Sequence, residues 1–336
     1  MRLKRIRLLH YVFLTFTLFF LVDASFFPFL RVSGLQNGSY QFRSNGTVDY
    51  PPPPSVYPFW SADSYWHKKI PVDAKVHPNS AQMIDWLMAF EDHNDGHPTI
   101  NYKRWTAPVY DAYASTPKHT VQRLDFGDYL YNVPIPDGAT PDQESDGWMI
   151  IIDWYNWVAY DFWRIRQENG QWICNAGWKW DLSGSGVGVD GKWTVHGSST
   201  MLLAMIIRPE EIEAGVIEHP LACAFRWTAT RKTNHVYPPA CTTDGKSTNS
   251  LAILEGSRIQ LNPNLNLDSY GLSRTAKIIA KALQDYGAIP MAVAGAFVLI
   301  AEHDMTANWA DWGLTGGILY SLPADWRIVD YSVFVV

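Results

Sequence analysis

Short apolar runs separated by turn residues dominate the chain from residue 148 onward. Residues 148–152 form a nearly all-apolar run, which is typical of a central strand. Residues 157–166 and 171–182 follow at hairpin spacing, with the turn signal Glu168-Asn169-Gly170 between them. Further strands are predicted at 201–207, 221–229, 258–261, 297–301 and 328–335. Because the runs do not alternate regularly with helices, they argue against a parallel α/β sheet.

The expected fold class is mainly β, a sandwich or jelly-roll-like antiparallel domain with two or three peripheral helices. Asn79 and Ser80 are placed to cap a helix that runs to Phe90. A second helix is predicted to start after Ser273 and to end at residue 287, and a short third to begin at Pro209, with Gly215 after its end.

The first residues have the order of an export signal. Four basic residues precede an uncharged run at 11–22, and Val22 with Ala24 supplies the small residues of a cleavage site after Ala24. Residues 1–24 are therefore predicted to be a signal peptide. The alternative is an uncleaved anchor, which needs about 20 apolar residues, whereas Asp23 interrupts this run. Under both interpretations we expect an extracellular or cell-surface protein, which touches the membrane only if the segment is retained.

Residues 25–58 are predicted to be a stalk. Asn37 and Asn45 begin two glycosylation acceptor sequences. The four prolines at 51–54 form a semi-rigid extended spacer. The remaining residues, 59–336, are expected to fold as a single β-rich globular domain.

Charge and cysteine usage exclude several functions. The net charge of −6 leaves no basic surface for nucleic acid. The glycines at 184–188 lack the spacing of a phosphate-binding loop, and no cofactor is predicted. Cys223 and Cys241 flank a polar, turn-rich stretch, so we predict a disulfide between them. Cys174 is interpreted as a buried small side chain, with a Cys/His catalytic pair as the alternative.

Sixteen tryptophans are the unusual feature of the composition. An indole serves a core and a flat binding face equally well, and sixteen are hard to bury at once. Strand alternation puts Trp178 and Trp180 on one face, with Lys179 and Asp181 on the other. Outside a cell, exposed indoles stack on sugar rings or on partner proteins. The predicted substrate-binding residues are Trp154, Trp157, Trp178 and Trp180.

Asp153, Asp161 and Asp181 are the candidate catalytic residues. An odd-numbered loop between the first two strands would put Asp153 and Asp161 on one face, and an even-numbered loop would put them on opposite faces. A same-face pair about 5 to 10 Å apart would suit glycoside hydrolysis. In the alternative, Asp153 caps a turn, Asp161 pairs with Arg164 or Arg166, and Asp181 ends a strand.

Other polar clusters are interpreted as solvated or structural. Residues 91–97 carry metal-type ligands, but the glycine is misplaced for a calcium loop, and no metal site is predicted. The acidic loop 142–146 is also expected to be solvated. Glu302, His303 and Asp304 suit acid–base chemistry, although no nucleophile is implied. His219 is interpreted as a hydrogen-bonded structural histidine.

Weak motifs follow one another along residues 59–310 in an order that resembles a family of secreted, largely uncharacterised bacterial proteins. The resemblance implies an exported globular domain and no established activity. The segments that carry it are Ile70-Pro71 with Asp73-Ala74, His77-Pro78-Asn79-Ser80, Pro108-Val109-Tyr110 with Ala114-Ser115-Thr116-Pro117, Asp153 with Tyr160-Asp161, Trp180-Asp181-Leu182, Arg208-Pro209-Glu210-Glu211-Ile212 with Gly215 and His219, and 278–287.

The chain departs from that family at two places. A histidine is expected after a Trp-Pro-Ala segment, where this chain reads Ala240-Cys241-Thr242. An Asp-Asn pair is expected where Ala292 and Val293 stand. If those polar residues are catalytic in the relatives, this chain has lost them, which weakens the enzymatic interpretation.

The sequence therefore favours a secreted or cell-surface protein that binds polysaccharide through an aromatic face. Hydrolysis by the clustered aspartates would make it similar to glycoside hydrolases. The alternative is a non-catalytic adhesion or envelope-structural module whose aromatic residues form a core and a protein interface. A groove with indoles and two same-face carboxylates would distinguish the first function from the second.

Overall fold

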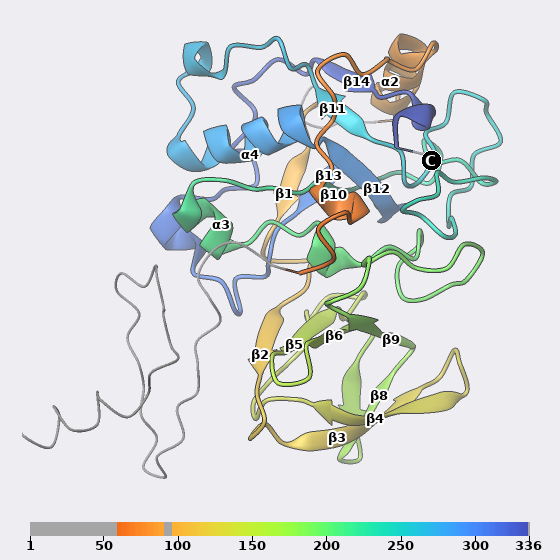
Figure 1. The fold of residues 1–336 in the computed structure, drawn as a ribbon, viewed down its shortest axis with the longest axis vertical. Coiled ribbons are helices and arrows are strands. Elements are labelled where there is room, and N and C mark those ends of the chain that lie inside the picture. Colours follow the sequence, from red (N-terminus) through yellow and green to blue (C-terminus); the bar gives the residue numbers. More distant parts are fainter. Residues whose placement is uncertain (1–58, 91–95, 335–336) are drawn as a thin grey trace, which may run out of the picture. The chain divides into compact units, whose positions relative to one another are not determined.

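The computed structural model describes residues 59–90 and 96–334. The predicted signal peptide and stalk, with Asn37 and Asn45, lie outside the described residues. The described part is mainly β, as predicted: fourteen strands form three mixed sheets, and three α-helices accompany them (Figure 1). All three sheets contain parallel as well as antiparallel pairs. None of the described helices is both long and apolar enough to span a membrane.

The largest sheet has six strands and two buried faces. Alternate residues of each strand point to opposite faces, so Cys223 and Phe225 contribute to a first core beneath the helices. Ala222 and Met291 contribute to a second core on the other face. In order across the sheet, the strands are β1 (Thr99–Asn101), β13 (Val298–Ile300), β10 (Leu221–Phe225), β12 (Ala288–Val293), β11 (Ile259–Leu261) and β14 (Trp326–Ile328).

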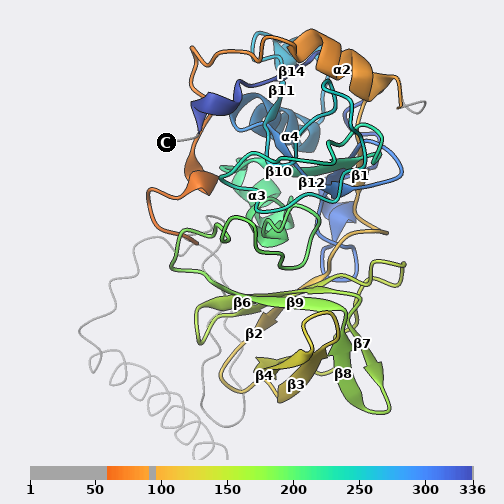
Figure 2. The ribbon, with the colours of Figure 1, turned by 90° about the vertical axis from the view of Figure 1, so that its right-hand side faces the viewer.

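The second sheet is a middle layer between two cores (Figure 2). Its order is β2 (Val109–Ala112), β5 (Met149–Asp153), β6 (Val158–Trp163) and β9 (Ala176–Asp181). Ile150 and Ile152 of β5 face the second core, whereas Met149 and Ile151 face a third core. All five residues of β5 are buried, which confirms the prediction of a central strand.

The third sheet closes the other side of the third core. Its order is β4 (Asp128–Pro134), β3 (Lys118–Arg123), β8 (Gln171–Cys174) and β7 (Arg166–Glu168). The predicted turn between β7 and β8 is confirmed, because Asn169 and Gly170 both have positive φ, 50° and 78°. The single strand predicted at 171–182 is divided: β8 belongs to this sheet and β9 to the middle sheet.

The three predicted helices are present. Helix α4 (Arg274–Asp285) is capped by the Ser273 hydroxyl, which accepts from the backbone N–H of Ala276. Helix α2 (Ser80–Met88) ends two residues before the predicted Phe90. Helix α3 (Pro209–Ala214) ends at Gly215, whose φ of 87° is the left-handed conformation that glycine favours. All three pack on the first core.

The apolar run at 201–207 is not a strand. It contains a 3₁₀ turn, Leu202–Ala204, and every residue of the run is buried. A short apolar run does not distinguish a buried strand from a buried turn, because both lack a polar face. The other 3₁₀ turns are Tyr65–His67, Leu267–Tyr270, Trp309–Trp312 and Tyr331–Val333.

The predicted disulfide is absent, because Cys174, Cys223 and Cys241 are all free and buried thiols. Cys223 lies within strand β10 and points into the first core. Cys241 packs in a different place, against Gly188. The polar stretch between these two cysteines is held by hydrogen bonds to neighbouring segments, such as that from Arg231 N–H to the Ile253 carbonyl.

Candidate functional site

The structure does not bring the three candidate aspartates together. The turn between β5 and β6 comprises residues 154–157, an even number. Asp161 is therefore the register partner of Ile150 and faces the second core, whereas Asp153 faces the third. Asp181 is opposite Val158, on the same face as Asp153 but two strands away. No carboxylate pair for glycoside hydrolysis arises from these three residues.

Each of these aspartates has a local structural partner. Asp153 caps the β5–β6 turn, because its carboxyl group accepts from the backbone N–H groups of Tyr155 and Asn156. Asp181 is exposed at the end of β9 and accepts from Ser183. Asp161 pairs with His196, and not with Arg164 or Arg166 as the alternative interpretation expected.

The four predicted substrate-binding tryptophans belong largely to the second core. Trp178 and Trp180 share a face of β9, as predicted, and Trp180 is buried. Trp154 and Trp157 are half-buried and pack against each other and against Phe59. These indoles do not form an open aromatic face.

A cavity of about 410 Å³ opens at the border of the second core. Ligand pockets for small molecules start at about 300 Å³, so the cavity is large enough to hold one. The lining comes from β1 and the loop after it, from the loop before β5, and from β10, β12 and β13, which form the floor. Its lining residues are Thr99, Asn101, Trp105, Ser145, Asp146, Trp148, Ala224, Ala292, Val293, Ala294, Gly295, Ala296, Val298 and Ile300.

Trp105 is the exposed aromatic side chain of this cavity, at 42% exposure. The Arg104 guanidinium lies 4.5 Å from the ring centre and also pairs with Glu144. The amide of Asn101 donates to the Trp105 carbonyl at 3.4 Å. Arg104 thus links the indole of Trp105 to the loop before β5, from which Glu144 comes.

Trp148 forms part of the inner wall. Its indole N–H is buried and has no hydrogen-bond partner among the described residues. An unsatisfied buried donor costs about 1–3 kcal/mol, so a bound acceptor would remove a real penalty. The ring packs edge-on against the imidazole of His196, with 5.1 Å between their centres.

His196 and Asp161 form a buried pair next to Trp148. Nε2 of His196 lies 2.9 Å from Oδ2 of Asp161, and both side chains are almost fully buried. The other atoms of the pair, His196 Nδ1 and Asp161 Oδ1, find no partner in the described part of the chain. Buried polar atoms are nearly always hydrogen-bonded, so this pair behind Trp148 is available to a bound water or ligand group.

Asp146 supplies the carboxyl group of the cavity lining. Burial raises its pKa, and a hydrogen bond from the Trp163 side chain opposes that effect. The loop 142–146 was expected to be solvated, but Asp142 is buried and Asp146 is half-buried. The loop folds inward because it leads directly into the buried strand β5.

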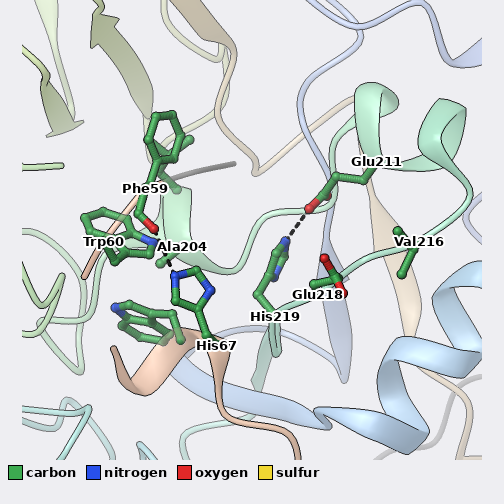
Figure 3. A pocket seen from close by; sticks show the side chains of 10 residues that line it. Phe59, Trp60, His67, Ala204, Glu211, Val216, Glu218 and His219 are labelled. Carbon is green, nitrogen blue, oxygen red and sulfur yellow. Dashed lines mark hydrogen bonds and ion pairs between the residues drawn. The ribbon is translucent and has the colours of Figure 1, made fainter. Parts of the chain in front are cut away.

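A second pocket, of about 80 Å³, is lined by Trp60 and His67 and by Glu211 of helix α3 (Figure 3). Both ring nitrogens of His219 are bonded there, to Glu211 at 2.6 Å and to the Pro220 carbonyl at 2.8 Å. Burial opposes the charged form of His219, but the Glu211 carboxylate outweighs it and raises the pKa. His219 is thus a structural histidine, as predicted, and the pocket is too small for a sugar ring.

The cluster Glu302, His303 and Asp304 is divided: Nδ1 of His303 lies 3.1 Å from Oδ1 of Asp304, whereas Glu302 pairs with Arg208. Glu302 accepts from Arg208 at 2.8 Å, and burial raises its pKa to about 7 although Arg208 opposes this. Nε2 of His303 lies 3.4 Å from Asp142. The segment 91–95 lies outside the described residues. No group of three or more metal-type side chains in the described residues could hold a metal ion.

The residues that form the cavity were not selected from the sequence. Trp105 and Asp146 line the cavity, and His196 packs on the lining residue Trp148. These residues come from three separate segments, and no spacing links them. The one available signal was the acidic loop placed immediately before a tryptophan and a buried strand. Ala292 and Val293, which replace the Asp-Asn pair expected from the resemblance, line the same cavity.

Comparison of the chain with protein-family models, with curated proteins and with solved structures finds no match. The resemblance to secreted bacterial proteins therefore stays a prediction.

Proposed function

We propose that this protein is exported and binds a saccharide in the 410 Å³ cavity between Trp105 and Asp146. The observation that carries the proposal is the combination of side chains in one cavity. An aromatic ring, a carboxyl group, an amide and an unsatisfied indole N–H surround a space of ligand size. Sugars present the complementary groups, because their rings have apolar C–H faces and a rim of hydroxyl groups.

Each wall of the cavity matches one part of such a ligand. Trp105 offers a ring held by Arg104, so little side-chain freedom is lost on stacking. Asp146 and Asn101 can accept and donate hydrogen bonds to hydroxyl groups. The alanine-rich floor can contact the apolar face of the ligand, and this contact leaves no buried polar group without a hydrogen bond.

The proposal is for binding without hydrolysis. Glycoside hydrolysis by carboxyl groups requires two of them on either side of the scissile bond. Among the described residues that line the cavity, Asp146 alone carries a carboxyl group. Ala292 and Val293 provide no second acid. The expectation of a non-catalytic adhesion module is compatible with this site, with a glycan as its partner.

A glycan array followed by calorimetric titration of the best oligosaccharide tests the proposal. Trp105→Ala should weaken binding by about tenfold or more, because a stacked ring is lost. Asp146→Asn should weaken it less, since an amide still bonds to hydroxyl groups. Trp227→Ala is the matched control, because that indole is 54% exposed and lies outside the cavity lining. Equal affinity in Trp105→Ala and the parent protein, or no ligand on the array, would refute the proposal.

A further inference from the structure

Two tyrosines are exposed side by side on the third sheet. Tyr129 and Tyr131 of β4 are 42% and 66% exposed. Their ring centres are 6.0 Å apart and their planes differ by 30°. Leu130 between them pairs with Val121 and packs on the third core, so both rings stand on the opposite, outer face. A pair of exposed rings so close together is not needed for packing.

The outer face around these rings is polar. Gln122 is the register partner of Tyr129 and shares its face. Further across the sheet, Ile173 is buried, and Arg166 lies three strands from Tyr129 and pairs with Glu168. Gln122 is therefore the hydrogen-bonding side chain next to the tyrosine pair. An interface that buries a large apolar surface would not have this composition.

The strand itself is poorly suited to bind another strand. β4 is an edge strand, but the register of its pairing with β3 shifts between His119 and Val121. Asn132 has a φ of 57°, outside the extended conformation. An irregularity of this kind at an edge prevents the addition of a further strand. A partner on this face must therefore be recognised by the ring surfaces rather than by the backbone.

We propose that Tyr129 and Tyr131 form a platform for an extended, β-linked polysaccharide chain, separate from the cavity. Two neighbouring rings on one face, with centres 6.0 Å apart, suit two successive sugar units of a straight chain. Gln122 is placed to bond to a hydroxyl group beside the ring of Tyr129. The platform rests on the proposed saccharide binding and extends it. It makes the ligand a polymer that binds at two sites, the cavity and the platform.

Depletion assays on insoluble cellulose and chitin test this second site. The double variant Tyr129→Ala/Tyr131→Ala should bind the polymer about tenfold or more weakly, because two stacked rings are lost. Tyr129→Phe/Tyr131→Phe should retain binding, since it keeps both rings. Tyr155→Ala is the control, because that tyrosine is 70% exposed in the β5–β6 turn and is not part of the platform.

The outcome separates the platform from the cavity. The double variant should keep its affinity for a short soluble oligosaccharide, and Trp105→Ala should lose that affinity. A parent protein that binds neither polymer would overturn the platform, as would a double variant that binds like the parent. In both cases oligosaccharide binding at Trp105 would still stand. A double variant that loses only its affinity for the oligosaccharide would instead count against the cavity.

Discussion

Oδ2 of Asp161 lies 2.9 Å from Nε2 of His196, and both side chains are buried next to Trp148. The contact joins strand β6 of the middle sheet to the segment that precedes the 3₁₀ turn Leu202–Ala204. It also fixes the imidazole on which the indole of Trp148 packs. The pair therefore positions one wall of the cavity rather than reacting with a substrate.

The three candidate aspartates should differ in their effect on stability. Asp161→Ala leaves a buried histidine unpaired and is expected to lower the free energy of unfolding by about 3 kcal/mol. Asp153→Ala removes a turn cap and should cost about 1 kcal/mol. Asp181→Ala changes an exposed side chain and should stay within about 0.5 kcal/mol. Urea unfolding of the three variants measures this order, and equal effects would contradict the assigned roles.

Periodicity predicted the elements with a strong local pattern. Strand β5 was recognisable because all of its residues are buried, and α4 because Ser273 caps a clear apolar stripe. Strands β1, β2 and β12 were missed, since their pairing depends on partners far away in the sequence. The neighbouring strands β3 and β4 were missed because most of their residues are polar or exposed and show no clear apolar run. The parity of the β5–β6 turn decided whether Asp153 and Asp161 share a face, and the sequence left that parity open.

The cavity was harder to predict than the fold. The lining combines Trp105 and Asp146 with residues of the six-stranded sheet such as Ala292, and the six-stranded and middle sheets pack together through the second core. The predicted tryptophans lie on β9 and the β5–β6 turn, where they fill the second core. At these four positions, the tryptophans therefore contribute to core packing.

A buried carboxyl pair should make the domain more stable in acid. The backbone N–H of Asp244 donates to Glu255 Oε2 at 3.1 Å, while Asp244 Oδ1 and Glu255 Oε1 are buried and have no hydrogen-bond partner within residues 59–90 and 96–334. Burial, and then the neighbouring Asp244, raise the pKa of Glu255 well above 4.5. The folded state thus holds the Glu255 proton more tightly than the unfolded chain does.

The sign of the pH effect follows from this raised pKa. The stabilisation is complete below the unfolded pKa of 4.5 and is lost as the pH rises through the folded pKa. Glu302, with a pKa of about 7, adds a loss between about pH 4.5 and 7. Each group contributes up to about 1.4 kcal/mol for each pH unit.

The variant Glu255→Gln isolates one of these groups. Its amide resembles the protonated acid, so the free energy of unfolding should fall less between pH 5 and pH 8 than in the parent protein. Denaturant unfolding at the two pH values measures the difference. A parent protein whose free energy of unfolding rises over this interval would contradict a protonated Glu255 in the folded state.

The three thiols should be free but unreactive. Burial raises the pKa of Cys174 to about 12 and that of Cys241 to about 11. A thiol reagent at pH 8 is expected to label none of them rapidly in the folded protein and all three in denaturant. If the reagent labelled only one thiol in denaturant, the result would support the disulfide between Cys223 and Cys241 that was predicted from the sequence.

The proposed export depends on the predicted signal peptide at residues 1–24 and is tested by protein chemistry. Cleavage after Ala24 predicts that the exported protein begins at Ser25. Mass spectrometry of the N-terminal peptide measures this directly. An intact chain beginning at Met1 and dissolved inside the cell would remove the proposed location.

The most direct measurement is a crystal structure of the protein with its best oligosaccharide. We predict density for a sugar ring stacked on Trp105, with hydroxyl groups in reach of Asp146 and an acceptor facing the indole N–H of Trp148. A saturated complex whose sugar lies elsewhere, with the cavity between Trp105 and Asp146 still vacant, would contradict the proposed site.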